Sequence, residues 1–301
     1  ATHAAQGYAR ISGRVGVAVA TSGPGATNLI TGIADAQIDS TPMVCITGQV
    51  PSHLLGSDAF QETDIVGIST PVTKWNHQIT RAEEIPEVIA KAFYIARSGR
   101  PGPVLVDITK DAQFESFDFT YKKCDGIRSY KPIPKINQNA LVDAAQTINN
   151  AKNPMIVWGQ GVILGKAEEE FKNFVEKSGI PAAWTIMGVS AIPTAHPLNV
   201  GMVGMHGNYA PNKLTNECDV LIAIGMRFDD RVTGKLSDYA TQAKVIHFEI
   251  DPAEINKNVK ADIAVLGDVK ETLAEILPMI ERKSYKKWHQ KFKDLLKIEF
   301  D

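Results

Sequence analysis

The chain has 301 residues, of which 44% are hydrophobic, and a formal net charge of −2, values that are ordinary for a globular protein. The balanced charge argues against a nucleic-acid-binding protein, and no apolar run approaches the ~18 residues of a membrane span. The three cysteines are widely spaced without a CxxC pair, which excludes a disulfide scaffold and a cysteine zinc site and suits a reducing cytoplasm. At roughly 100–200 residues per domain, this length predicts two domains.

The chain opens on an apolar stripe at helical spacing, formed by residues 1, 4, 5, 8, 9 and 11. No initiating Met and no capping residue precede this stripe. We therefore expect the sequence to be a fragment that starts inside a helix. A processed N-terminus is the alternative.

The first third alternates predicted strands and helices. Continuous apolar runs predict buried parallel strands at residues 15–20, 43–47 and 103–108, with helices over 26–36 and 82–97. The stretch 109–137 is charged, contains prolines and lacks periodicity, so it is predicted to be a linker.

A second alternating series follows. It predicts strands at residues 154–158, 180–184, 220–224, 245–250 and 263–266, with helices over 139–149, 166–178 and 269–280. Two such series predict an α/β protein with two doubly wound parallel-sheet domains. The basic, aromatic segment 282–301 is predicted to be a solvated linking helix rather than a membrane or calmodulin-like surface.

Two loops of the first domain are candidate ligand sites. The turn TSGPGATN follows a strand, and its two glycines allow close backbone approach to a ligand. The long loop 48–62 also leaves a strand's carboxyl end, where open α/β sheets bind ligands, and it carries Gln49, Phe60 and Gln61. Packed turns without a ligand are the alternative for both loops.

Arg100 is held between a helix end and a strand by Pro101 and Pro103. A guanidinium in a defined direction suits a phosphate, which it binds through two hydrogen bonds. A charge that only complements the helix end is the alternative.

Glycine-rich strand ends recur in the second domain, in the segments WGQG, GMHG, GMRFDDR, HFEID and GDV. Glu249 is placed to bind a ribose hydroxyl, and Gly204 and Gly207 would let a flat ring or a pyrophosphate lie on the backbone. A surface histidine at His206, a simple turn at Asp229 and Asp230 and a strand-end glycine at Gly225 are the alternatives, and the GxGxxG fingerprint is absent. The pattern predicts a nucleotide-type ligand.

Taken together, ATSGPGATNLITGIADAQIDSTP, GQVP…DAFQE, SGRPGPVLVD, GMHG and GMRFDDRVTGKL resemble acetolactate synthase large subunits from residue 1 to about 281. This resemblance implies a thiamine pyrimidine-binding domain at 1–112, a linker at 113–136 and an FAD-binding central domain at 137–281. Residues 282–301 would lead to a third domain that binds the diphosphate. The catalytic glutamate of the family would lie just before Ala1, so we expect no catalytic residue and no metal ligand within this chain.

The resemblance also implies roles for individual residues. It puts Gln61 near thiamine and implies a substrate channel bordered by Pro51, Ala59, Phe60, Lys74 and Asp230. It implies that FAD contacts Arg100, Gly159, Gly161, Thr185, Ile186, Gly204, Met205, His206, Gly207, Gly225, Arg227, Asp229, Arg231, Glu249, Ile250, Asp268 and Val269. Gln160 departs from the family pattern, because many relatives have glycine there.

The implied activity is a transferase reaction: a carboligase joins pyruvate to pyruvate or 2-oxobutanoate with loss of CO2, in valine and isoleucine biosynthesis. The implied cofactors are thiamine diphosphate, Mg2+ and FAD. A cytoplasmic homodimer or homotetramer with a separate regulatory small subunit is expected, with no nucleic-acid or membrane partner, and the fragment alone is expected to be inactive. The alternatives are a pyruvate oxidase, a glyoxylate carboligase, or a nucleotide-binding module without catalysis. The absence of GxGxxG disfavours a nicotinamide dehydrogenase.

Overall fold

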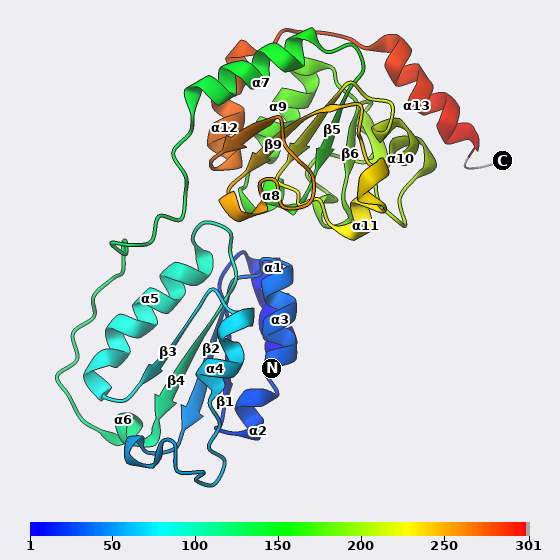
Figure 1. Ribbon diagram of the computed structural model, residues 1–301. Helices are drawn as coiled ribbons and strands as arrows, with labels where there is room; N and C mark the ends of the chain where they lie inside the picture. Colours follow the sequence, from blue (N-terminus) through cyan, green and yellow to red (C-terminus); the bar gives the residue numbers. More distant parts are fainter. Residues whose placement is uncertain (299–301) are drawn as a thin grey trace. The chain divides into compact units, whose positions relative to one another are not determined.

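The computed structural model describes residues 1–298. Its contacts divide the chain into two compact units, Ala1–Pro132 (unit 1) and Ile133–Asp301 (unit 2). Each unit contains one parallel sheet with helices packed against it (Figure 1). The predicted α/β class with two parallel sheets is therefore confirmed. Among the described residues, no helix combines the length and the apolar character that a membrane span requires.

The sheet of unit 1 has four strands in the order β1-β2-β4-β3, all paired in parallel. The strands are β1 (Gly16–Ala20), β2 (Met43–Gln49), β3 (Trp75–Ile79) and β4 (Pro103–Thr109). The helices are α1 (Thr2–Ser12), α2 (Pro24–Thr27), α3 (Ile30–Ile38), α4 (Ile65–Ser69), α5 (Ile85–Arg97) and α6 (Lys110–Phe114).

Side chains of the central strands alternate between two apolar layers, because successive residues of a strand point to opposite faces. Met43 and Cys45 of β2 pack with Ile33 of α3 in one layer. Val44, between them, packs with Ala92 of α5 in the other layer. Both central strands are thus buried on both faces, as their continuous apolar runs predict.

The prediction of a buried strand at residues 15–20 is wrong: β1 lies at the sheet edge, and Val19 is 67% exposed. The helix predicted at the start of the chain is confirmed as α1, which buries Ala5 and Ala9 of the apolar stripe and leaves Tyr8 and Ile11 exposed. Small side chains face the sheet because α1 packs closely against it and against α3.

The sheet of unit 2 has six parallel strands in the order β10-β9-β8-β5-β6-β7. The strands are β5 (Pro154–Trp158), β6 (Ala182–Trp184), β7 (Asn199–Met202), β8 (Val220–Ile224), β9 (Lys244–Glu249) and β10 (Ile263–Leu266). The helices are α7 (Gln138–Asn150), α8 (Gln160–Leu164), α9 (Glu168–Ser178), α10 (Tyr209–Thr215), α11 (Asp230–Thr233), α12 (Val269–Ile276) and α13 (Lys286–Ile298).

Helices cover both faces of the second sheet (Figure 1). Helices α7, α9 and α12 bury one face, where Trp158 of β5 packs against Phe171. Helices α10 and α13 cover the other face, where Leu221 of β8 and Leu214 lie in one cluster with Trp288. The doubly wound arrangement follows from strands that are apolar on both faces.

Helix α13 packs on unit 2, so the prediction of a solvated linking helix is wrong for its aromatic face. Trp288 and Phe292, one helical turn apart, are 4% and 2% exposed. The Trp288 Nε1–H donates to the Pro154 carbonyl at 2.8 Å, at the start of β5. The lysines of α13 stay exposed, and Lys291, beside the aromatic face, lies over the Trp288 ring and pairs with Glu217. The last three residues of the predicted helix, 299–301, lie outside the described residues.

Trp288→Ala is expected to lower the free energy of unfolding of unit 2 by about 3–5 kcal/mol, because it opens a cavity under α13. Trp288→Phe keeps an aromatic ring but removes the hydrogen bond to Pro154, at a cost of about 1 kcal/mol. Urea denaturation followed by circular dichroism measures both changes. Lys293→Ala, on the exposed face of α13, is the control, and a loss for Trp288→Ala no larger than for this variant would contradict the packing role.

Candidate functional site

The carboxyl edge of the second sheet contains a topological switch point. The chain passes from β5 to β6 and β7 on one side, then crosses to β8, β9 and β10 on the other. The turns after β5 and β8 therefore leave neighbouring strands in opposite directions, which opens a crevice where α/β sheets of this kind bind ligands. Gly159 follows β5, Gly161 lies in the first turn of α8, and Gly225 follows β8.

The glycines at this crevice pack backbone against backbone. The Gly161 N–H donates to the Gly225 carbonyl at 2.8 Å. A Cβ on Gly161 would lie 2.6 Å from the Gly225 Cα, and Gly225 itself has a left-handed φ of 56°. Side chains are therefore excluded on both sides, and the two segments pack backbone against backbone.

A second close contact joins the loop after β7 to helix α11. The Met205 N–H donates to the Arg231 carbonyl at 2.7 Å, and the Arg231 Nη1 lies 3.4 Å from the Met205 sulfur. A Cβ on Gly204 would lie 2.7 Å from the same Arg231 carbonyl. The side chain of Met205 is 61% exposed and so offers an apolar surface at the sheet edge.

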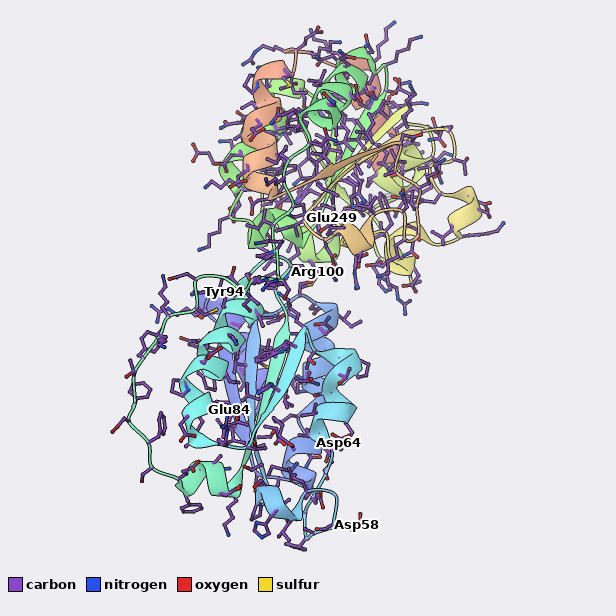
Figure 2. The ribbon with its side chains drawn as sticks, turned by 60° about the vertical axis from the view of Figure 1, so that its left-hand side comes forward. Asp58, Asp64, Glu84, Tyr94, Arg100 and Glu249 are labelled. Atoms are coloured by element: carbon purple, nitrogen blue, oxygen red, sulfur yellow. The ribbon has the colours of Figure 1, made fainter. Side chains whose placement is uncertain are left out.

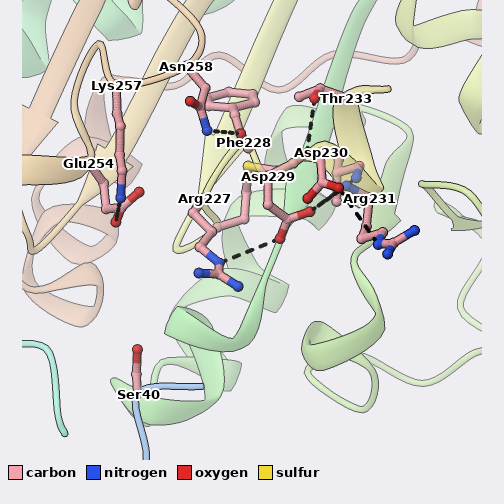
Figure 3. Close-up of polar contacts among 12 residues, drawn as sticks. Ser40, Arg227, Phe228, Asp229, Asp230, Arg231, Thr233, Glu254, Lys257 and Asn258 are labelled. Carbon is pink, nitrogen blue, oxygen red and sulfur yellow. Dashed lines mark hydrogen bonds and ion pairs between the residues drawn. The ribbon is translucent and has the colours of Figure 1, made fainter. Parts of the chain in front are cut away.

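The turn between β8 and α11 is shaped by Asp229 (Figure 3). Its Oδ1 accepts hydrogen bonds from the N–H groups of Arg231 and Val232 at 3.0 and 3.1 Å, and so begins α11. Its Oδ2 lies 3.5 Å from the Nε of Arg227. Asp229 therefore has the turn-forming role that was the alternative interpretation of the sequence. The side chain of Asp230, by contrast, is 84% exposed.

Beneath this turn lies a buried histidine that sequence reasoning did not single out. His247 of β9 has no exposed surface, and its Nε2 lies 2.9 Å from the Met226 carbonyl. Burial lowers the pKa of His247, so the ring is neutral near pH 7 and Nε2 is the donor. The available signal was one polar residue inside the apolar run of β9. His247 fixes the backbone that leads into residues 227–231.

Glu249 ends the same strand. Its Oε1 accepts hydrogen bonds from the N–H groups of Ile250 and Asp251 at 2.9 and 3.1 Å. Its Oε2 lies 3.7 Å from the His247 Nε2. The carboxylate is thus held at the carboxyl edge, next to the turn after β10, where the Gly267 N–H donates to the Glu249 carbonyl at 3.0 Å.

The remaining predicted residues of unit 2 follow strands at this same edge. Thr185 and Ile186 come after β6, and Asp268 comes after β10 and caps α12 through the Lys270 N–H. The structure therefore brings the sixteen predicted residues of unit 2 to one edge of the sheet: Gly159, Gly161, Thr185, Ile186, Gly204, Met205, His206, Gly207, Gly225, Arg227, Asp229, Arg231, Glu249, Ile250, Asp268 and Val269. Their role in flavin binding stays a prediction.

In unit 1 the two predicted loops are in contact at the carboxyl edge. Gly23 has a left-handed φ of 58°, and a Cβ there would lie 2.8 Å from the Gln61 carbonyl. Gln61 is itself left-handed, with φ 60°, a conformation that is uncommon for a residue other than glycine. The turn after β1 thus packs directly against the backbone of Gln61.

Carboxylates fasten the loop that carries Gln61. Glu62 accepts hydrogen bonds from the Gly56 N–H and, at 2.9 Å, from the Ala59 N–H, and these donors hold its pKa below the ordinary value. Asp111 of α6 accepts from the Ser52 hydroxyl and, at 3.0 Å, from the Ser52 N–H. The pKa of Asp111 is well below its usual range for the same reason. Sequence reasoning missed both carboxylates, because the partners of Glu62 are backbone groups within a turn and the partner of Asp111 is a serine distant in sequence.

Lys74 and Arg100 lie at the opposite edge of the first sheet, as Figure 2 shows for Arg100 relative to Asp58 and Asp64. The Lys74 ammonium donates to the carbonyls of Ile95 and Ser98 at 2.6 and 2.7 Å, at the end of α5. The Arg100 Nε donates to the Ser40 hydroxyl at 2.8 Å. Lys74 thus interacts favourably with the negative end of a helix.

The five predicted channel residues are not gathered in one place within a unit. Pro51, Ala59 and Phe60 share the loop at the carboxyl edge of unit 1, while Lys74 lies at the other edge and Asp230 belongs to unit 2. Phe60 is 87% exposed. The substrate channel stays a prediction.

An open polar groove of about 610 Å³ lies at the amino edge of the second sheet. Asp143, Asp219 and Lys244 are among the residues that line it. The two carboxylate oxygens of Asp219 accept hydrogen bonds from the N–H groups of Lys152 and Asn153 at 2.6 and 2.9 Å. None of the residues predicted to bind a ligand lines this groove.

Comparison with known families identifies both units. Residues 1–68 match the model for the N-terminal TPP binding domain of thiamine pyrophosphate enzymes, and residues 141–276 match the model for their central domain. Together the two matches cover more than half of the chain. The chain therefore belongs to the thiamine pyrophosphate enzyme family.

The chain is also similar to several individual proteins. The chain is 50% identical to the acetolactate synthase large subunit of Corynebacterium glutamicum over 92% of this chain and 44% of that protein. It is 48% identical to a probable acetolactate synthase large subunit of Methanocaldococcus jannaschii over 99% of this chain and 51% of that protein. For acetolactate synthase isozyme 1 large subunit of Escherichia coli the identity is 45%, over 97% of this chain and 51% of that protein. The chain thus spans about half the length of the relatives it matches.

Glu62→Gln is expected to loosen residues 52–60, because an amide has one acceptor oxygen and leaves the Gly56 or the Ala59 N–H without its partner. Chymotrypsin at neutral pH should then cut at Leu54 or Phe60 several times faster than in the wild-type chain. Glu83→Gln, an exposed carboxylate on the same unit, is the matched control. Equal cleavage rates in the two variants would show that Glu62 does not fasten the loop.

Proposed function

We propose that these residues belong to an acetolactate synthase, which condenses pyruvate with pyruvate or 2-oxobutanoate and releases CO2, in the biosynthesis of valine and isoleucine. The observation that carries the proposal is the identity of 45–50% with acetolactate synthase large subunits over at least nine-tenths of the chain. In this proposal residues 1–112 bind the thiamine pyrimidine, residues 113–136 link the two domains, and residues 137–281 bind FAD. Residues 282–301 connect this second domain to a third one.

The proposed FAD site is the carboxyl edge of unit 2, where the donor set suits a dinucleotide. The close backbone contact between Gly161 and Gly225 sets the segments after β5 and β8 side by side at this edge, where a flat or pyrophosphate group would lie against them. Arg227 and Arg231 supply cations for a diphosphate, and Glu249 supplies a carboxylate for a ribose hydroxyl. Arg100 of unit 1 is assigned to the same site by resemblance. The flavin is proposed to be a structural element that takes no net electrons.

The proposed thiamine site is the carboxyl edge of unit 1. Thiamine diphosphate, when bound with Mg2+, supplies the electron sink that decarboxylation of a 2-keto acid requires. The chain's own contribution here is to hold Gln61 next to the turn 21–25 and to present the exposed ring of Phe60 beside it. Pro51, Ala59, Lys74 and Asp230 are proposed to border the path of the substrate.

The assembly is proposed by analogy with the relatives. Several of them are named large subunits, which implies a separate small subunit in those proteins. We extend that arrangement to this protein, with a regulatory small subunit, a homodimer or homotetramer of the large subunit, and a cytoplasmic location.

The 301-residue chain is expected to bind FAD, with quenching of flavin fluorescence on titration. Gly161→Ala should weaken binding at least about tenfold, because the new Cβ must displace the Gly225 backbone. The matched control is Gly7→Ala, where a Cβ meets nothing within 4 Å. No quenching up to about 1 mM FAD, a concentration that would detect even weak binding, would overturn the flavin assignment.

The complete protein is expected to form acetolactate from pyruvate when Mg2+, thiamine diphosphate and FAD are supplied, without a net change in flavin absorbance. A colorimetric acetolactate assay run beside a flavin spectrum measures both. Net bleaching and reoxidation of the flavin would instead indicate an oxidase. Bound FAD without any product would favour a nucleotide-binding module without catalysis.

A further inference from the structure

Strand β4 of unit 1 carries a carboxylate inside the sheet. Asp107 has no exposed surface and lies in the otherwise apolar run PVLVDIT. Removing an ionised carboxylate from water costs several kcal/mol unless hydrogen bonds replace the water. A buried acid at this position therefore needs a set of donors around it.

Those donors come from the strands on both sides of β4. The Thr47 hydroxyl of β2 donates to Oδ1 at 2.6 Å. The Gln49 amide of β2 and the Gln78 amide of β3 donate to Oδ2 at 3.1 and 2.9 Å. All three donors are neutral, so burial still raises the pKa of Asp107, and the three hydrogen bonds limit that rise.

One of these donors also controls the loop that follows β2. The Gln49 Nε2 donates at 2.8 Å to the Thr63 carbonyl, and the Gln49 Oε1 accepts from the Val50 N–H at 2.9 Å. Val50 opens the loop 50–62 and Thr63 closes it. The Gln49 amide therefore ties together the two ends of the segment that carries Gln61, and Asp107 fixes the orientation of that amide.

The stability of unit 1 alone does not explain why position 107 carries an acid. An apolar side chain of similar volume would fill the position without any desolvation cost, and such replacements of buried ionic groups are often neutral or stabilising. What an apolar residue could not supply is an acceptor that selects one orientation of the Gln49 and Gln78 amides. Asp107 thus contributes a fixed orientation of these two amides at the carboxyl edge of unit 1.

We propose that Asp107 is a positioning residue for the loop formed by residues 50–62. Its carboxylate orients the Gln49 amide, the amide clamps the two ends of residues 50–62, and the clamp holds Gln61 against the turn after β1. We further expect the ordered loop to favour binding of the thiamine ring, and only this step rests on the proposed function.

Two variants of similar size separate acceptor geometry from packing. Asp107→Asn keeps an oxygen for Gln49 and Gln78, while its NH2 faces the Thr47 hydroxyl, which can accept. Asp107→Leu fills the space but removes every acceptor. Val106→Ala, one residue earlier in β4 and packed on the α5 side, is the control for a damaged sheet without a polar change.

Hydrogen–deuterium exchange of the 301-residue chain reads out loop order without any cofactor. Asp107→Leu should raise amide exchange in residues 50–64 at least about tenfold relative to the peptides of β1 and β2. Asp107→Asn should stay within about threefold of wild type, and Val106→Ala should show no selective rise in the loop. If Asp107→Leu fails to fold, Gln49→Leu cuts the same link and should give the same selective rise.

Unchanged loop exchange in Asp107→Leu or in Gln49→Leu would overturn the proposal, and so would an Asp107→Asn variant as loose as Asp107→Leu. In the complete protein, the thiamine diphosphate concentration for half-maximal activity should rise at least about tenfold in Asp107→Leu and stay near wild type in Asp107→Asn. FAD affinity should not change in either variant. If Asp107→Leu loosens the loop but leaves this concentration unchanged, Asp107 still holds the loop through Gln49, and the loop has no role in thiamine binding.

Discussion

Every strand within residues 1–298 runs parallel to its neighbours in the sheet, and that one constraint decides where chemistry can occur. In a parallel sheet all the carboxyl ends emerge at one edge, so every turn that follows a strand opens on the same side. Turns that are far apart in sequence therefore become neighbours. In unit 2 this brings together glycines that follow β5 and β8, two strands that are paired in the centre of the sheet.

Backbone packs directly on backbone at the carboxyl edges of both sheets. Gly161 and Gly225 meet without side chains between them, and Gly23 meets the backbone of Gln61 in the same way. Contacts this close leave no room for a Cβ, and they give each crevice a shape that does not depend on flexible side chains. A site that must hold a large cofactor in one position gains from such rigidity.

Beneath each edge lies a buried polar side chain that holds the turn above it. His247 fixes the turn after β8 through the Met226 carbonyl, and Asp107 fixes the loop after β2 through Gln49. Both groups are fully buried, so each would be costly without the hydrogen bonds it makes. The two units use the same device: a polar group inside an apolar strand orients the backbone where that strand, or its neighbour, ends.

The sequence alone determined the elements that are apolar on all sides and the loops that follow them. The strands at 154–158, 220–224 and 263–266 are confirmed to the residue, because continuous apolar runs have few other folded states. The edge strands β3 and β7 escaped prediction, since WNHQI and NVGM carry too little apolar character to be distinguished from loop. Tertiary structure alone decided which face of α1 is buried, that α13 packs on unit 2, and that Asp107, Gln49 and Thr63 meet. Those outcomes depend on which surfaces are brought together by the order of strands in the sheet, and strand order is a property of the whole chain rather than of any local pattern.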